Sequence, residues 1–114
     1  MVTPGPASIV IIPFPFSDLS ATKLRPAVVL ADTSQGDWLL CQITSNPYSD
    51  SQAIEITKSD LKKGALNTVS FVRPMKLFTA NEALMLKRVA ILKDATYKAI
   101  LTAITVSLQK NMPK

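Results

Sequence analysis

The sequence predicts a small, mainly β protein in which a strongly bent barrel is covered by one C-terminal helix. Residues 8–92 contain several short runs of apolar and β-branched residues separated by polar turns, which indicates many short strands. After residue 92 the apolar residues recur three or four positions apart, which indicates one amphipathic helix. No helical pattern separates the early strands, so parallel βαβ units are not expected.

Length and composition indicate a single domain over residues 1–114. A chain of 114 residues can bury a modest core, and 47% hydrophobic content with three glycines argues against disorder. The sequence shows no internal repeat, linker or low-complexity segment. Residues 1–7 are expected to form a flexible N-terminal arm.

The first half of the chain predicts three strands. The unbroken apolar run over 27–31 is typical of a strand buried on both faces. Gly36 lies near the end of a polar turn, so the second and third strands should pair as a hairpin. Pro13 and Pro15 should end the first strand or confine its end to a sheet edge. The strands are expected over 8–14, 24–31 and 38–44, with the turn over 32–37 and a mobile loop over 17–23.

The second half predicts shorter elements before the helix. Gly64 is placed to close a short helical turn that begins at Thr57. Arg73-Pro74 repeats an earlier pattern, a basic residue before proline at an apolar strand. The expected elements are an edge strand over 53–56, the helical turn over 57–64, a strand over 67–72, a turn over 78–83 and a last strand over 87–92.

The C-terminal helix is expected to begin at Asp94, whose side chain is placed to cap its N-terminus. About four turns should follow. One face of this helix is too apolar to be exposed to water, and we expect it to serve the core, a dimer interface or both. The residues of that face are Tyr97, Ile100, Leu101, Ile104 and Leu108.

The charge balance favours an anionic partner. Thirteen basic residues against eight acidic ones give a net charge of +5 and a pI near 9.6. Such a balance makes polyanions, nucleic acid above all, the first partners to consider. The alternative is a soluble protein that is merely basic.

The side-chain inventory excludes several kinds of site. The chain has no histidine, which excludes Ser-His and Cys-His catalysis and in practice a structural zinc site, so no metal or cofactor is expected. Cys41 is the only cysteine; it should pack in the core, and a reducing compartment is expected. No apolar run reaches the roughly 18 residues that span a membrane, and Met1–Ala7 lacks the basic region of a signal peptide. These features predict a cytoplasmic protein.

Arg25 stands where the second strand begins. Pro26 follows it and favours an extended backbone at Arg25. A guanidinium stays protonated and offers five donors in a rigid fork, which suits phosphate binding. The alternative is a surface arginine paired with a carboxylate.

Polar side chains follow the third strand at Thr44, Ser45 and Asn46. Strand-end hydroxyls can hold phosphate oxygens by hydrogen bonds. The alternative is turn chemistry, which favours the same residue types. Phe14 and Phe16, which alternate near the end of the first strand, should complete the core, or one of them should offer a base-stacking surface.

Four segments carry a resemblance to a known family: IIPFPFSDL (11–19), LRPAVVL (24–30), QITS (42–45) and VRPMKLF (72–78). Together they resemble the MazF/PemK family, the toxins of bacterial type II toxin–antitoxin systems. The resemblance covers nearly the whole chain, in the family's order and spacing.

The resemblance implies an SH3-like barrel that acts as a homodimer and binds single-stranded RNA in its interface groove. It implies a sequence-specific, metal-independent endoribonuclease that inhibits translation and leaves a 2′,3′-cyclic phosphate and a 5′-hydroxyl. The family's catalytic arginine falls on Arg25 and its strand-end hydroxyl on Thr44, with Ser45 beside it. Arg25 would stabilise developing negative charge, and Thr44 would hold a phosphate oxygen.

Further residues are expected to contact RNA on the same resemblance. Arg73 and Lys76 would line the groove and bind phosphates, and Asp18 is a candidate general base. The full set expected to bind RNA is Phe16, Asp18, Lys23, Asn46, Arg73 and Lys76. The implied partner is a cognate antitoxin with a disordered acidic segment, and operator DNA would be bound only together with that antitoxin.

The chain also departs from the family pattern. Many relatives carry Gly-Asp where this chain has Ala7-Ser8, a carboxylate within the loop that is here 20–23, or an acidic residue near Met75. The departures keep open a catalytically weak or inactive homologue that only binds nucleic acid or an antitoxin-like peptide. An unrelated barrel interaction module is a third interpretation. A gyrase-directed toxin of the CcdB type is disfavoured by the pairing of Arg-Pro with Ile-Thr-Ser.

Overall fold

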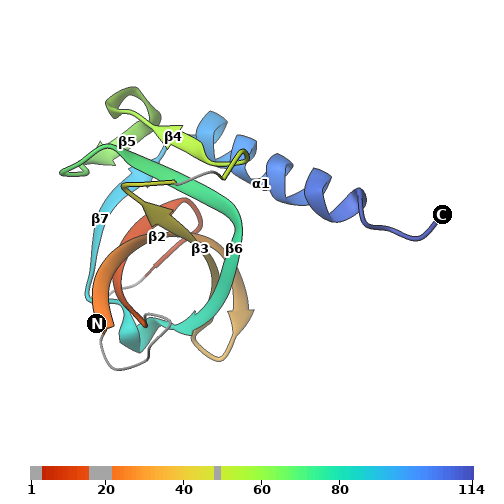
Figure 1. Ribbon diagram of the computed structural model, residues 1–114. Helices are drawn as coiled ribbons and strands as arrows, with labels where there is room; N and C mark the ends of the chain where they lie inside the picture. The colour runs from red at the N-terminus through yellow and green to blue at the C-terminus, as the bar shows by residue number, and fades with distance from the viewer. Residues whose placement is uncertain (1–3, 16–21, 48–49) are drawn as a thin grey trace.

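The computed structural model describes residues 4–15, 22–47 and 50–114. These residues form one antiparallel seven-stranded sheet, curled into a nearly closed barrel, with helix α1 lying across one end (Figure 1). The sheet order is β4-β6-β3-β2-β1-β7-β5. The predicted fold class is therefore confirmed. The elements are β1 (Ser8–Pro15), β2 (Thr22–Ser34), β3 (Asp37–Thr44), β4 (Ile54–Ile56), β5 (Leu61–Gly64), β6 (Ser70–Asn81), β7 (Lys87–Leu92) and α1 (Asp94–Gln109), with 3₁₀ turns at Lys58–Asp60 and Glu82–Leu84.

The bent sheet buries both of its faces, which explains the unbroken apolar runs. Side chains alternate between the faces of a strand, so neighbours such as Val28 and Val29 enter different apolar clusters although both are fully buried. One cluster lies beneath α1 and includes Ile100 and Ile104 of that helix. Cys41 packs in this cluster as expected, and burial raises the pKa of its thiol to about 12, so it is no nucleophile.

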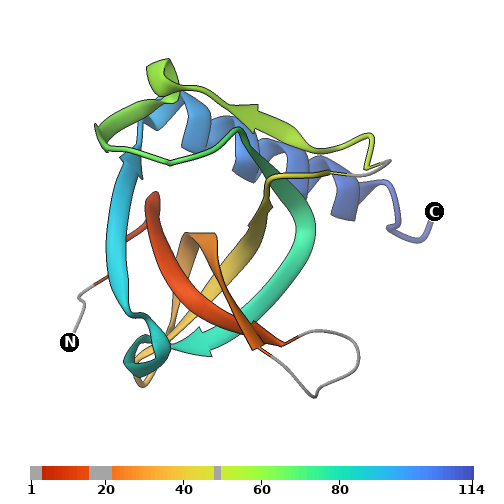
Figure 2. The ribbon, with the colours of Figure 1, turned by 60° about the vertical axis from the view of Figure 1, so that its left-hand side comes forward.

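Helix α1 lies across the barrel, and its C-terminal end extends past it, as Figure 2 shows. The Tyr97 hydroxyl donates to the Leu30 carbonyl over 2.6 Å. Leu101 and Leu108 are exposed, so the predicted apolar face is only partly covered in the single chain. No helix in the described ranges is long and apolar enough to cross a membrane.

The predicted cap of α1 is wrong. Lys93 is the N-cap residue, and Asp94 lies in the first turn with its side chain 96% exposed. The start of the helix is held instead by Asp60, whose carboxylate accepts a hydrogen bond from Thr96 Oγ1 over 2.8 Å. An interaction between residues this far apart in sequence leaves no local signal.

Two predicted boundaries in the second half are also corrected. Only Lys58–Asp60 are helical, and Leu61–Gly64 form β5, which pairs with β7. The strand that was expected to end at residue 72 is β6, which continues to Asn81 because pairing with β3 resumes at Leu77. The expected turn over 78–83 is thus mostly strand, and its helical part begins at Glu82.

The expected flexible arm is corrected for residues 4–7. The Ala7 amide donates to the Val29 carbonyl, and the Ala7 carbonyl accepts from the Leu92 amide, each over 2.9 Å. Ala7 is buried and has a φ of 75°, a left-handed conformation that costs a non-glycine residue energy. Glycine, which the family resemblance implies at this position, would adopt this φ without that cost. Residues 1–3 lie outside the described ranges.

Gly64 of β5 pairs with Ala90 of β7 at a position that leaves no room for a side chain. Its φ is +86°, and a Cβ there would lie 2.1 Å from the Val89 carbonyl oxygen. We expect Gly64→Ala to lower the free energy of unfolding by about 2 kcal/mol or more, measured by urea denaturation. Gly5→Ala is the matched control, because nothing lies within 4 Å of the added Cβ, and it should stay within about 0.5 kcal/mol of wild type. Equal stability of the two variants would contradict this packing.

Candidate nucleic-acid interface

The end of β3 is framed by two interruptions of the sheet. On one side, pairing of β3 with β2 begins at Gln42–Ala27, directly after Pro26. On the other side, Cys41 pairs with Leu77 of β6, and Ile43 pairs with Val72. The four residues Arg73–Lys76 of β6 therefore lie opposite a single residue of β3, Gln42. Proline cannot donate to a ladder, and both interruptions contain one. Each Arg-Pro dipeptide therefore places its arginine beside the end of β3.

Arg25 and Thr44 lie on neighbouring strands at this end of the barrel. Ala27 and Gln42 form the last β2–β3 pair at this end. Arg25 precedes Ala27 by two residues on β2, and Thr44 follows Gln42 by two residues on β3. Arg25 is half-buried and stands opposite Ile12 of β1. Lys23 lies further along β2, opposite Phe14, and its side chain is exposed. The sheet thus gathers the two predicted catalytic positions at one end.

The hydroxyl of Thr44 is engaged by the turn that follows it. Oγ1 accepts from the Asn46 amide over 3.2 Å and donates to the Asn46 carbonyl over 3.0 Å. Thr44 is 7% exposed, whereas Ser45 and Asn46 are exposed. These bonds correspond to turn chemistry, the alternative interpretation for these residues. Of the two hydroxyls, that of Ser45 is the more accessible.

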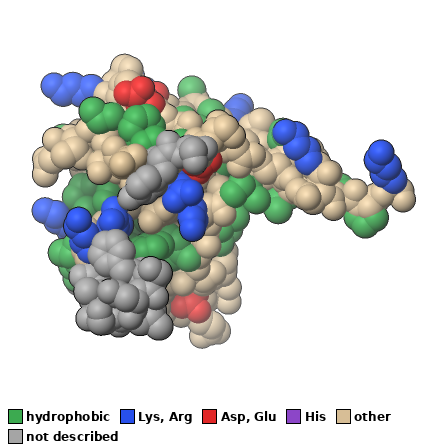
Figure 3. Space-filling model, viewed as in Figure 1, with side chains coloured by type: hydrophobic (Ala, Val, Ile, Leu, Met, Phe, Trp, Pro, Cys, Tyr) green, Lys and Arg blue, Asp and Glu red, His purple; other side chains and the backbone are tan. Residues whose placement is uncertain are grey.

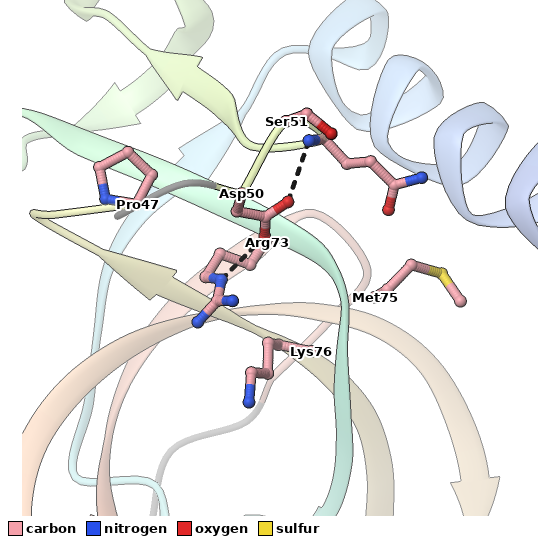
Figure 4. A pocket seen from close by; sticks show the side chains of 7 residues that line it. Pro47, Asp50, Ser51, Arg73, Met75 and Lys76 are labelled. Atoms are coloured by element: carbon pink, nitrogen blue, oxygen red, sulfur yellow. Dashed lines mark hydrogen bonds and ion pairs between the residues drawn. The ribbon is translucent and has the colours of Figure 1, made fainter.

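Arg73 is held by protein groups on two sides. Its Nε donates to Asp50 Oδ2 over 2.8 Å, and its Nη1 contacts Gln42 Oε1 at 3.4 Å. The side chains of Arg73 and Asp50 are only 22% and 18% exposed. Figure 4 shows this ion pair together with the hydrogen bond from the Gln52 amide to Asp50. The sequence analysis did not select Asp50, since no motif marks an acidic residue in a polar loop as the partner of a distant arginine.

The ion pair lies in a cavity of about 420 Å³ between the β3–β4 loop and β6. Lys76 points into the same region in Figure 4 and is exposed. One acidic and two basic side chains line the cavity, so its surroundings are net positive and suit an anionic ligand. The lining residues are Pro47, Asp50, Ser51, Gln52, Arg73, Met75 and Lys76.

The remaining predicted contacts are only partly described. Phe14 packs edge-to-face against Phe78 with ring centroids 5.0 Å apart, which supports its packing interpretation. Phe16 and Asp18 lie outside the described residues. Figure 3 shows Lys and Arg side chains gathered on the barrel face viewed there, with few acidic ones among them.

The Asp50–Arg73 pair gives a pH prediction. The Arg73 hydrogen bond, followed by that of the Gln52 amide, holds the pKa of the Asp50 carboxyl below its usual range. A carboxyl with a lowered pKa stabilises the fold above its unfolded-state pKa and loses that contribution as the pH falls through its folded pKa. Asp50→Asn should therefore lower the free energy of unfolding by about 1 kcal/mol at neutral pH. This difference should shrink as the pH falls below about 4 and vanish only below the folded-state pKa of Asp50. Urea denaturation across this pH range measures it.

The fully exposed Asp94 offers a control, and Asp94→Asn should change stability little at any pH. A difference between wild type and Asp50→Asn that stays constant down to the acid limit would contradict the ion pair.

Residues 6–108 match the family described as PemK-like, MazF-like toxin of type II toxin-antitoxin system. No curated protein matches the chain.

Solved structures share the fold at low identity. A MazE–MazF complex from Deinococcus radiodurans has a TM-score of 0.74 at 14% identity, covering 93% of this chain and 96% of that one. A mycobacterial endoribonuclease bound to its cognate antitoxin has a TM-score of 0.72 at 15% identity, covering 97% and 100%. The Mycobacterium tuberculosis toxin MazF-mt6 has a TM-score of 0.68 at 17% identity, covering 90% and 96%. From the family match over residues 6–108, the chain belongs to the PemK-like, MazF-like toxins of type II toxin–antitoxin systems.

Proposed function

We propose that this chain is an endoribonuclease toxin that cleaves single-stranded RNA at specific sequences and thereby inhibits translation. The observation that carries the proposal is the pair of Arg-Pro dipeptides beside the end of β3, on a fold and in a family of such toxins. The similarity in fold to the mycobacterial endoribonuclease supports this proposal.

The cleavage proceeds on groups that RNA itself supplies. The 2′-oxygen attacks the neighbouring phosphorus and gives its proton to a base, while the bond from phosphorus to the 5′-oxygen breaks and that oxygen takes up a proton. The products are a 2′,3′-cyclic phosphate and a 5′-hydroxyl. Arg25 stabilises the negative charge that builds up on the phosphoryl oxygens. No metal ion enters these steps, and Asp18 remains the candidate base.

A strand-end hydroxyl holds the phosphate in line for attack. Thr44 and Ser45 both stay in this role as predictions. The exposure of Ser45 favours it for direct contact, whereas the bonds of Thr44 to Asn46 favour a role in shaping the turn that presents Ser45.

A cognate antitoxin and a second copy of the chain are the proposed protein partners. The antitoxin-bound structures from mycobacteria and Deinococcus radiodurans support the first, and operator DNA would be bound only together with that antitoxin. The exposed apolar side chains of α1 support the homodimer, because water-exposed Leu101, Val106 and Leu108 would be covered in it. The toxin acts on RNA in the cytoplasm.

An inactive homologue that only binds RNA or an antitoxin-like peptide is the second candidate function. The departures at Ala7-Ser8, in the 20–23 loop and at Met75 favour it, because they remove carboxylates or glycine that relatives often carry. Binding of RNA without cutting would identify it.

The decisive variant is Arg25→Ala. Purified protein is incubated with a mixed-sequence RNA in EDTA, and cleavage products are mapped and tested for cyclic phosphate. Wild type should give discrete cuts, and Arg25→Ala should lower the rate by about 10²-fold or more with an unchanged circular dichroism spectrum. Arg88→Ala on β7 is the charge-matched control and should stay within about twofold of wild type, since only the overall charge changes. Equal rates for Arg25→Ala and Arg88→Ala would contradict the mechanism.

A further inference from the structure

We infer that Asp50 is a positioning residue that sets which RNA sequences are cut, and that Arg73 holds Asp50 and not a phosphate. The inference rests on the proposed function. It differs from the sequence-based expectation, in which Arg73 and Lys76 both contact phosphates. Hydrogen bonds between Asp50 and β6 and between Gln52 and α1 support it.

Both oxygens of the Asp50 carboxylate are used within the protein. Oδ2 accepts from Arg73 Nε over 2.8 Å, and Oδ1 accepts from the Gln52 amide over 2.9 Å. Hydrogen bonds in which the donor or the acceptor is ionised are stronger than neutral ones, and the bond from Arg73 joins two ionised groups. Because the pair is mostly buried, water competes for it poorly. Nη1 of Arg73 also donates to Gln42 of β3 over 3.4 Å, so two of its three side-chain nitrogens bond to protein atoms.

The same residue organises the backbone of the loop. The Asp50 amide donates to the Pro47 carbonyl over 3.0 Å, and its carbonyl accepts from the Ala53 amide over 3.2 Å. Two residues on, the Gln52 side chain donates to the buried Ser107 hydroxyl of α1 over 2.9 Å. The loop is thus fixed at Asp50 to β6 and at Gln52 to the helix.

This arrangement fixes the shape of the cavity beside the end of β3. Pro47 and residues 50–52 form one wall of the cavity and β6 forms the other, and the Asp50–Arg73 bond joins the two walls. Proteins read single-stranded RNA by enclosing splayed bases in pockets with placed polar groups. A loosened wall should therefore accept several bases where a fixed wall accepts one. Lys76 is exposed at the same cavity, so it is the cation available to a phosphate.

The double variant D50N/R73Q separates the two roles of Arg73. It removes one negative and one positive charge, so the net charge of the protein is unchanged. Two readouts are needed. The first is selectivity, the ratio of kcat/KM at a preferred RNA site to kcat/KM at a poor site. The second is the salt slope, the change in the logarithm of the binding constant of a 2′-deoxy RNA analogue with the logarithm of the salt concentration. D50N alone is measured beside it, since it keeps an amide that can bond to Arg73.

We expect D50N/R73Q to lower the selectivity ratio about tenfold and to leave the salt slope unchanged, because no phosphate contact is lost. D50N alone should lower selectivity in the same direction. Lys76→Gln is the opposite control: it should reduce the magnitude of the slope by about 0.7, the value for one contact to a single strand, and keep the selectivity. If D50N/R73Q reduced the magnitude of the salt slope by about 0.7 and kept the selectivity, the inference would be overturned.

Hydrogen exchange keeps this test separate from the proposed function. If wild type cuts no RNA, the proposed function fails, and with it the role in selectivity. Exchange of the amides over 50–53 still reports whether Asp50 holds the loop, because a lost tie raises local opening. We expect exchange there to be at least about tenfold faster in D50N/R73Q than in wild type or Lys76→Gln. Unchanged exchange would overturn the role of Asp50 in positioning.

Discussion

Proline at positions 26 and 74 has no amide hydrogen to give to a ladder, and this constraint shapes the whole site. The β2–β3 ladder begins just after Pro26, and the β3–β6 ladder is broken around Pro74. A continuous sheet would cover the end of β3 with paired backbone on both sides. The β2 side of this end is unpaired, and the β6 side is interrupted opposite Gln42 before pairing resumes at Ile43–Val72. The polar end of β3 and the residues preceding each proline therefore meet at one place on the barrel.

The two Arg-Pro dipeptides look alike in the sequence but have different surroundings. Arg73 pairs with Asp50 and contacts Gln42, so its charge is largely neutralised within the protein. Arg25 is carried by a strand that is fixed on its other side by pairing with β1. A rigid strand can hold a guanidinium ready for a charge that appears only during the reaction, which is the condition under which electrostatic stabilisation is most effective. In the proposed function one arginine therefore acts on the substrate and the other shapes the wall beside it.

The sequence predicted what depends on local pattern. The first three strands, the last strand and the C-terminal helix follow from periodicity, and the hairpin between β2 and β3 follows from turn chemistry at Gly36. The turn itself is shorter than the predicted 32–37, because β2 continues to Ser34 and β3 begins at Asp37. It did not predict features that depend on distant partners. Asp60 replaces Asp94 at the start of the helix, and β6 runs through Pro74 because β3 pairs with it again further on. The role of Asp50 was missed for the same reason, since its partner Arg73 is 23 positions away.

We propose that one phosphate of the substrate lies beside the end of β3, between Arg25 and the strand-end hydroxyls. A crystal structure of the protein with a short RNA that carries 2′-deoxy at the scissile position tests it most directly. The account predicts that the scissile phosphate contacts the Arg25 guanidinium and the Ser45 hydroxyl, with the Asp50–Arg73 bond intact. RNA bound across α1, or a scissile phosphate held by Arg73 in place of Arg25, would contradict it.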